Sequence, residues 1–174
     1  TDFLNLPKTQ KGINSYTLDN PFKFLYVSQV IVYKHQWNVA KAILKLRSEG
    51  YQVHLDLIGP NTLESFEKLN EVIKGNDHVV SYLGIVPHDE ISKYYKEADA
   101  FVFASTCENM PIILIEAMTA GLPIACSVKQ PMPEVLGKGG LYFDALNVES
   151  IYNCLKELLE NKNKKEEISK IAYQ

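Results

Sequence analysis

Two acidic residues, Glu108 and Glu116, are separated by seven residues, and Pro111 lies between them. Proline has a fixed φ and no N–H group, so it suits the first turn of a helix and not its middle. We therefore expect a helix from about residue 111 to 120, ended by Gly121. The helix is apolar on nearly every side, which predicts that it is largely buried. Glu116 then needs a partner, because an unpaired buried carboxylate is costly.

The spacing of these groups suits a nucleotide-sugar. Free N–H groups at a helix N-terminus bind anions. Glu116 lies five residues beyond Pro111, about 7–8 Å along a helix and roughly one sugar ring from such an anion. Its carboxylate could accept both vicinal hydroxyls of a ribose, with Glu108 facing the group beyond the phosphates. The alternative is that Glu116 is paired with a buried Lys, Arg or backbone group and that Glu108 is a solvated loop acid.

Residues 108–123, with the sequence ENMPIILIEAMTAGLP, resemble the Glu-x7-Glu signature of the retaining glycosyltransferases called group 1, or family four, which have the GT-B fold. The resemblance extends from about Phe24 to Leu159, which is most of the chain. It implies the C-terminal, donor-binding domain of a hexosyltransferase. Such an enzyme transfers a sugar from a nucleoside diphosphate to a glycan, lipid-linked or other hydroxyl acceptor, as in polysaccharide biosynthesis.

In this family an arginine after the first strand and a lysine five residues later hold the donor diphosphate. The resemblance places Lys34 on the lysine and Gln29 on the arginine. An amide cannot neutralise charge, so stabilisation of the leaving diphosphate would fall on Lys34 and on the helix N-terminus. Either another cation substitutes for the arginine, or the activity is weaker.

The turn Gly-Ile-Val-Pro at residues 84–87 resembles the family segment whose backbone binds the edge of the nucleobase. Gly84 would allow the tight path, and Val86 would offer its amide and carbonyl. The alternative is a plain turn from strand to helix. Because the backbone would make these contacts, the side chains do not tell which base is bound.

The resemblance also assigns roles around the expected helix. Four residues at its N-terminus would contact the diphosphate: Asn109, Met110, Pro111 and Ile112. Their amides and Lys34 would help the diphosphate leave. Glu108 would orient the donated sugar, and Glu116 would hold the ribose. The donor would be a UDP- or GDP-sugar, and neither a cofactor nor a protein-bound metal is implied.

The alternation of apolar runs and amphipathic stretches predicts the fold. Strands are expected at residues 24–30, 53–58, 79–83, 100–104, 123–127 and 140–143. Helices are expected at about 37–49, 62–74, 88–97, 111–120, 148–160 and 163–173. This order predicts an α/β, Rossmann-like, doubly wound parallel sheet of about six strands with helices on both faces, one half of a GT-B fold. Ligands bind beyond the carboxyl ends of such strands, where the functional loops would converge.

Composition restricts the class of protein. With 46% hydrophobic and 22% charged residues among 174, the chain is typical of one soluble globular domain. A net charge of −3 argues against nucleic-acid binding. No apolar run approaches the length of a transmembrane helix. Three scattered cysteines without metal-ligand spacing predict reduced thiols and a cytoplasmic location.

Residues 1–22 are mostly polar and lack a sustained period, so we expect a linker or irregular N-terminal segment before a donor-binding domain at residues 23–174. A GT-B enzyme needs a second domain across a cleft, so the N-terminal acceptor domain would be absent here. The isolated chain should then bind nucleotide weakly and transfer nothing. Any peripheral membrane association would come through the absent domain.

Three other functions are compatible with some of these features. A related GT-B enzyme domain, such as a nucleotide-sugar epimerase or phosphorylase, stays open. An inactive nucleotide-binding or interaction domain also stays open because of Gln29. A dinucleotide-binding module predicts G-x-G-x-x-G after the first strand and an acid ending the second. The chain has SQVIVYK and Ile58-Gly59 at those places, so this third rival is disfavoured.

Overall fold

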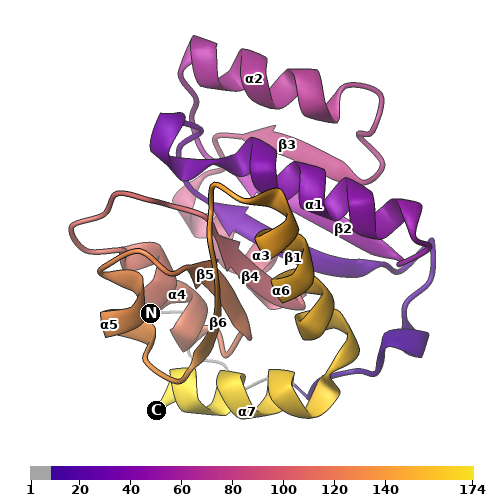
Figure 1. Cartoon of the computed structure of the whole chain (residues 1–174), viewed down its shortest axis with the longest axis vertical. Helices are drawn as coiled ribbons and strands as arrows, with labels where there is room; N and C mark the ends of the chain where they lie inside the picture. Colours follow the sequence, from indigo (N-terminus) through magenta and orange to yellow (C-terminus); the bar gives the residue numbers. More distant parts are fainter. Residues whose placement is uncertain (1–8) are drawn as a thin grey trace.

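The computed structural model describes residues 9–174. They form an α/β domain around one sheet of six strands in the order β3-β2-β1-β4-β5-β6, and every neighbouring pair is parallel (Figure 1). The strands are β1 (Phe22–Val27), β2 (Val53–Ile58), β3 (Val80–Gly84), β4 (Ala100–Phe103), β5 (Ile124–Ser127) and β6 (Gly140–Phe143). The predicted Rossmann-like, doubly wound parallel sheet is confirmed.

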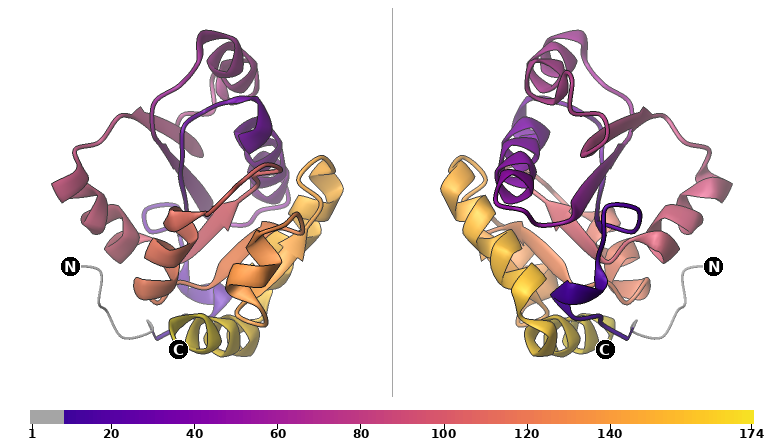
Figure 2. Two further views of the ribbon diagram at one scale, coloured as in Figure 1. Left: turned by 90° about the vertical axis from the view of Figure 1, so that its left-hand side faces the viewer. Right: turned by 90° about the vertical axis from the view of Figure 1, so that its right-hand side faces the viewer.

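The helices of the described residues flank this sheet. They are α1 (Gln36–Ser48), α2 (Leu63–Ile73), α3 (His88–Glu97), α4 (Ile112–Thr119), α5 (Met132–Leu136), α6 (Val148–Glu160) and α7 (Lys162–Tyr173), with short 3-10 helices η1 (Ile13–Ser15) and η2 (Val32–Lys34). Helices α1 and α6 pack together on one face, while α3 and α4 lie on the other (Figure 2). Helix α7 crosses one end of the domain against α4 and β6 (Figure 1).

The chain reverses its direction of travel at the middle of the sheet. From β1 it moves outward to β3, and it then returns to β4 on the other side of β1. In open α/β sheets such a reversal leaves a crevice beyond the carboxyl ends of the two central strands, and ligands bind there. The loops after β1 and β4 therefore border the crevice where a site is expected.

The two central strands are buried almost completely. Every residue of β4 is buried, and in β1 only Lys23 is partly exposed. The rings of Tyr26 and Phe103 meet edge to face, with their centroids 5.6 Å apart. A parallel sheet covered on both faces explains why these strands are continuous apolar runs in the sequence.

Strand β1 ends at Val27, earlier than the predicted end at Val30. Val30 lies beyond the strand and forms only an isolated parallel bridge with Asn61, in which its N–H donates to Pro60 O at 2.7 Å. Gly59 makes this approach feasible: a Cβ atom there would lie 2.3 Å from Ser28 O. The backbone therefore leaves the strand early and joins the turn beside it.

Helix α4 is less buried than predicted. Only Leu114 and Ala117 are buried within it, whereas Ile112 and Ile115 are 62% and 37% exposed. The expectation of a largely buried helix is wrong, because α4 lies on one face of the sheet and covers it with a single stripe of its surface. Apolar composition on all sides did not indicate burial on all sides.

The two ends of α4 compare differently with the prediction. Pro111 was expected in the first turn, but it is the N-cap residue and the helix begins at Ile112. Gly121 ends the helix as predicted, at φ 67°. Its N–H donates to Met118 O at 2.9 Å, and Leu122 N–H donates to Ala117 O at 3.1 Å. These two bonds form a Schellman motif, which favours glycine at the left-handed position.

The described part of the predicted N-terminal linker packs against the domain. Tyr16 is buried, and its hydroxyl donates to Asp99 Oδ1 at 3.1 Å. Lys165 of α7 donates from Nζ to Lys11 O at 3.2 Å. The segment before β1 is thereby held against the amino-terminal end of β4 and against the last helix. Residues 1–8 of the predicted linker lie outside the described residues.

Candidate functional site

The loops after β1 and β4 are joined by hydrogen bonds at the carboxyl edge of the sheet. Thr106 N–H donates to Tyr33 O at 2.9 Å. The Tyr26 hydroxyl accepts from Ala104 N–H at 3.1 Å and donates to Lys34 O at 2.5 Å. Burial raises the pKa of Tyr26 well above its usual value, so this phenol remains a donor. The segments that carry the two predicted catalytic residues are therefore fixed to each other.

His35 links the same two loops from a constrained backbone position. It is in the left-handed region, at φ 50° and ψ 33°, which few residues other than glycine adopt. Its Nε2 atom lies 3.0 Å from Thr106 Oγ1, and its ring meets the Trp37 ring edge to face at 5.6 Å. Burial, followed by the positive charge of Lys68, lowers the pKa of His35.

Lys34 and Glu108 form an ion pair, and Ser105 Oγ donates to the same carboxylate oxygen, Oε1. The Lys34 and Glu108 side chains are only 10% and 14% exposed. The Lys34 ammonium also lies over the Phe103 ring, 4.8 Å from its centroid. The two predicted catalytic residues thus lie together, with the charge of each compensated by the other.

Ser105 was not among the predicted site residues. It is fully buried two residues beyond the end of β4, and it donates to the carboxylate three residues further along the chain. The available signal was the polar residue that ends an apolar strand just before Glu108. Polar residues at that point of a parallel sheet lie at the ligand edge.

The N-terminus of α4 begins with a tight turn. Pro111 has φ −81° and ψ 79°, and Ile112 N–H donates to Met110 O at 3.0 Å, which is an inverse γ-turn. Of the predicted diphosphate contacts, Pro111 has no N–H and Ile112 already has an acceptor. Within the described residues the amides of Asn109, Met110 and Ile113 have none. The N–H groups left for an anion at this helix end therefore include that of Ile113 and exclude Pro111 and Ile112.

Glu116 has the partner that its position required, and this partner is a phenol. The carboxylate is half-buried, and its Oε2 atom accepts from the Tyr95 hydroxyl at 3.0 Å. Among the described residues Glu116 forms no ion pair. The alternative of a salt link in the core is therefore not what the structure contains.

The predicted nucleobase turn lies at the same edge, beyond β3. Gly84 has φ 66°, as a tight path requires, and its carbonyl accepts from Gly59 N–H at 2.8 Å. Val86 is partly buried against the core. Gln29 is exposed after β1, with its backbone carbonyl bound by Gln36 Nε2 at 2.8 Å. The sheet order places Gln29 near the crevice and the Gly84 turn two strands away.

A hollow of about 350 Å³ adjoins the ion pair. Its lining residues are Tyr33, Cys107, Glu108, Asn109 and Met110. Helix α4 begins at its rim, so the hollow connects the paired charges with the exposed loop before the helix. A small charged ligand at this place would contact both.

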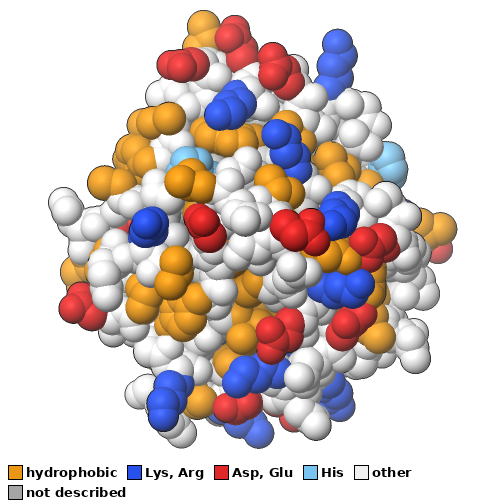
Figure 3. All heavy atoms as spheres, in the orientation of Figure 1, with side chains coloured by type: hydrophobic (Ala, Val, Ile, Leu, Met, Phe, Trp, Pro, Cys, Tyr) orange, Lys and Arg blue, Asp and Glu red, His pale blue; other side chains and the backbone are white. Residues whose placement is uncertain are grey.

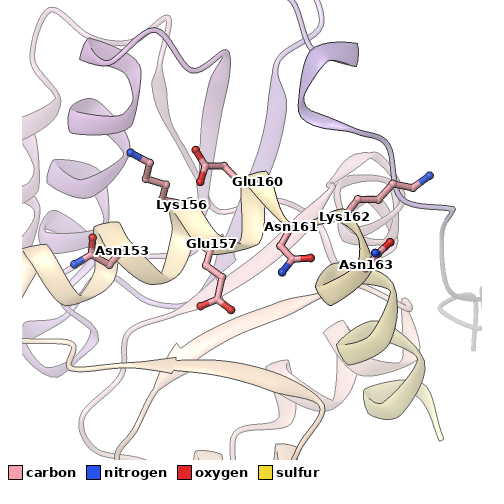
Figure 4. A pocket seen from close by; sticks show the side chains of 7 residues that line it. All are labelled: Asn153, Lys156, Glu157, Glu160, Asn161, Lys162 and Asn163. Carbon is pink, nitrogen blue, oxygen red and sulfur yellow. The ribbon is translucent and has the colours of Figure 1, made fainter.

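A larger hollow, of about 710 Å³, lies where α6 meets α7, away from this edge (Figure 4). Two of the charged side chains that line it have partners of their own: Lys156 pairs with Glu49 at 3.3 Å, and Glu160 accepts from the Tyr51 hydroxyl. On the face shown in Figure 3, acidic and basic side chains are interspersed over the whole surface. We interpret the larger hollow as a solvent-exposed concavity at the junction of α6 and α7.

Residues 9–174 contain no group of three or more His, Cys, Asp or Glu residues that could hold a metal ion. None of the helices in this part of the chain is both long enough and apolar enough to cross a membrane.

Comparison with known proteins defines the class. The family described as "Glycosyl transferases group 1" matches residues 9–174. Together with the Rossmann-like sheet and the crevice at its carboxyl edge, this match assigns the class of protein. The chain belongs to the group 1 glycosyltransferase family, and its fold is that of a GT-B glycosyltransferase domain.

Individual relatives cover parts of the chain. It is 34% identical over 82 residues to the O-antigen chain mannosyltransferase B of Escherichia coli, covering 47% of this chain and 22% of that protein. It is 31% identical over 111 residues to the sulfoquinovosyl transferase SQD2 of Arabidopsis thaliana, covering 61% of this chain and 21% of that protein. The chain thus spans about a fifth of the length of these relatives.

Solved structures share the fold. The C-terminal domain of a group 1 glycosyl transferase family protein (LpcC) from Francisella tularensis superposes with a TM-score of 0.80 at 19% identity, covering 98% of this chain and 92% of that one. Anabaena HepE, in complex with UDP and glucose, gives 0.80 at 20% identity, covering 94% of this chain and 49% of that one. At these identities the likeness extends to the fold alone.

Proposed function

We propose that this chain is the nucleotide-sugar-binding domain of a retaining glycosyltransferase of family four. It would transfer a hexosyl group from its donor to a glycan, lipid-linked or other hydroxyl acceptor. One observation carries the proposal: in a member of the group 1 family, Lys34 and Glu108 meet beside the N-terminus of α4, and Glu116 extends from the same helix.

The donor would be a UDP-sugar. HepE has been solved with UDP and glucose, and the pneumococcal O-GlcNAc transferase GtfA with UDP and GlcNAc; the latter shares 19% identity and a TM-score of 0.76. In this chain, the pyrophosphate would lie between Lys34 and the free amides of Met110 and Ile113. The ribose would lie at Glu116, and the uracil at the turn of Gly84 and Val86. A GDP-sugar is the alternative donor.

The ion pair gives donor binding a defined order. Lys34 and Glu108 compensate each other before the donor arrives. A diphosphate carries more charge than a carboxylate, so it would draw the ammonium to its own oxygens and release Glu108 to orient the sugar. The amides at α4 would stabilise the charge that develops on the departing diphosphate. Attack from the face that the diphosphate leaves needs no nucleophile from the protein.

The rest of the enzyme would supply the acceptor. We propose that residues 23–174 form the donor-binding domain and that residues 1–22 lead to an N-terminal acceptor domain. This second domain would also mediate any peripheral membrane association of a cytoplasmic enzyme. The isolated chain would bind nucleotide without transferring sugar. Detectable transfer by this chain alone would contradict the assignment of donor and acceptor binding to two separate domains.

Nucleotide titration tests the proposal. UDP, GDP and ADP are titrated by calorimetry into the chain and into Lys34→Ala and Glu116→Ala. We expect UDP to bind best. Lys34→Ala should lose about 1.5–3 kcal/mol, the size of a hydrogen bond to a charged group, or roughly 10- to 150-fold in affinity.

Lys45→Ala is the matched control. Lys45 lies on α1 and pairs with Glu149 at 2.6 Å, away from the crevice, so its loss should leave UDP affinity unchanged. If neither Lys34→Ala nor Glu116→Ala weakens UDP binding, the proposed site is wrong.

A second candidate is an inactive nucleotide-binding or interaction domain. Gln29 favours it, because an exposed amide stands where the family resemblance expects an arginine. Activity of the full-length protein separates the two. An inactive domain would bind UDP while the full-length protein transfers no sugar, and a GT-B epimerase would be identified by its product.

A further inference from the structure

Tyr95 is held rigidly behind the candidate site. It lies on α3 and is fully buried. Its ring stacks on Phe101 of β4, with the centroids 5.7 Å apart and the planes inclined at 19°. Phe101 in turn stacks on Phe103 at 6.5 Å. A column of aromatic rings rooted in the sheet therefore fixes the position of the phenol.

The Tyr95 hydroxyl donates to Oε2 of Glu116 at 3.0 Å, across 21 residues of sequence. The other oxygen, Oε1, has no hydrogen-bond partner within the described residues. One oxygen of the carboxylate is thus anchored, and the other stays available. A glutamate has several rotatable bonds, and anchoring one oxygen limits the orientations that remain.

A phenol suits this task better than a cation would. A lysine or arginine at this place would compensate the charge of Glu116 and weaken it as an acceptor. The phenol orients the carboxylate and leaves its charge in place. Burial, together with the adjacent Glu116 charge and hydrogen bond, raises the pKa of Tyr95 well above its usual value. The hydroxyl therefore remains a donor at any pH at which the domain is studied.

We propose that Tyr95 is a positioning residue that pre-orients Glu116 for the vicinal hydroxyls of the donor ribose. This inference rests on the proposed function and extends it to selectivity for ribonucleotides over deoxyribonucleotides. The Glu116 side chain already loses its conformational entropy when the chain folds. Ligand binding therefore does not carry that cost again.

The experiment compares UDP with 2′-deoxy-UDP by calorimetry, on the wild-type chain, on Tyr95→Phe and on Tyr94→Phe. The phenylalanine at 95 keeps the ring and its stacking, and it removes only the hydroxyl. We expect Tyr95→Phe to weaken UDP binding about three- to tenfold, the effect of releasing one oriented side chain. Binding of 2′-deoxy-UDP should change less, so the ratio of the two affinities should fall.

Tyr94→Phe is the matched control. Tyr94 is the neighbouring tyrosine on α3 and packs partly against the core, and its variant should keep both affinities. Thermal unfolding of the two variants reports any loss of stability. A merely structural role of the hydroxyl would lower stability and weaken both nucleotides equally.

The outcomes separate the two proposals. If the wild-type chain binds UDP and depends on Glu116, but Tyr95→Phe leaves the ratio unchanged or weakens both nucleotides equally, the role of Tyr95 is refuted while the proposed function stands. If the wild-type chain binds neither UDP nor GDP, both fail together.

Discussion

Individual side chains at the crevice determine how much of the negative charge of a bound diphosphate would be compensated. Lys34, Ser105 and Glu108 form one hydrogen-bonded cluster, and the only basic side chain of that cluster is Lys34. The exposed amide of Gln29 adds no charge. An incoming diphosphate would then be bound by one ammonium and by backbone donors. Leaving-group stabilisation at this site is therefore open to improvement by a single added cation.

Gln29→Arg should strengthen UDP binding. A guanidinium at this exposed position, just beyond β1, could form two parallel bonds to phosphate oxygens. We expect a gain of about tenfold in affinity, or roughly 1.4 kcal/mol, since part of the benefit is lost to solvent. Calorimetric titration of UDP at fixed ionic strength measures it.

Asn163→Arg is the control for net charge. Asn163 is an exposed amide on α7, at the hollow between α6 and α7 (Figure 4). An equal gain in that variant would mean that Gln29→Arg acts through long-range charge and does not contact the phosphate. No gain in Gln29→Arg would place Gln29 outside the diphosphate site.

At the scale of elements, the contact between the loops after β1 and β4 should depend on pH through His35. An unfolded histidine has a pKa of about 6.5, and the pKa of His35 is lower in the folded chain, chiefly because of burial. The folded state therefore disfavours the proton. The resulting stability is fully present above the unfolded pKa, and it is lost as pH falls through the folded pKa.

His35→Asn tests this dependence, because asparagine tolerates the left-handed backbone and does not titrate. Thermal unfolding is followed from about pH 7.5 to about pH 5.5, on either side of the ordinary histidine pKa. The midpoint of the wild-type chain should fall further over this interval than that of the variant. Parallel declines in the two proteins would show that His35 does not contribute.

The elements themselves were largely predictable from sequence. The β2, α3, β6 and α6 boundaries agree with the apolar periodicity, because a covered parallel sheet and amphipathic helices leave strong patterns. The burial of α4 was misjudged, since composition does not tell which side of a helix meets the sheet. The contact of Tyr95 with Glu116 was also invisible. It joins two helices through side chains, and no spacing rule describes it.

The candidate site was predictable only in part, for the same reason. Sequence indicated that Lys34 and Glu108 lie at one edge of the sheet. It did not indicate that they pair with each other, or that the Ile112 N–H donates to the Met110 carbonyl. Both facts depend on the exact course of two loops, which tertiary contacts determine.

At the scale of the whole domain, its first described residues and its last helix are joined by a buried lysine. Lys165 is fully buried in α7. Its Nζ atom donates to Lys11 O at 3.2 Å and lies 4.8 Å from the centroid of the Phe22 ring. Burial lowers the pKa of this lysine, against the opposing charge of Asp99. The aliphatic stem thus fills the core while the ammonium holds the segment before β1.

Packing by the stem should outweigh the charge of Lys165. Lys165→Ala should destabilise the domain by about 2–4 kcal/mol, because it leaves a cavity. Lys165→Met should stay within about 1 kcal/mol of the wild type, because it keeps the volume and removes the cost of a buried charge. Urea unfolding measures both changes, with Lys170→Ala, an exposed site on the same helix, as the control. An equal loss in the methionine and alanine variants would show that the ammonium contact dominates.

The Tyr26 hydroxyl has a mechanical consequence for ligand exchange. It lies between the Ala104 amide and the Lys34 carbonyl, so the backbone segments that carry the lysine and the glutamate share one buried anchor. Displacement of either segment would also displace the other, and it would break both hydrogen bonds where no water can replace them. Arrival and departure of a small molecule must then proceed by rotation of side chains about a stationary frame, without any hinge opening between these two loops.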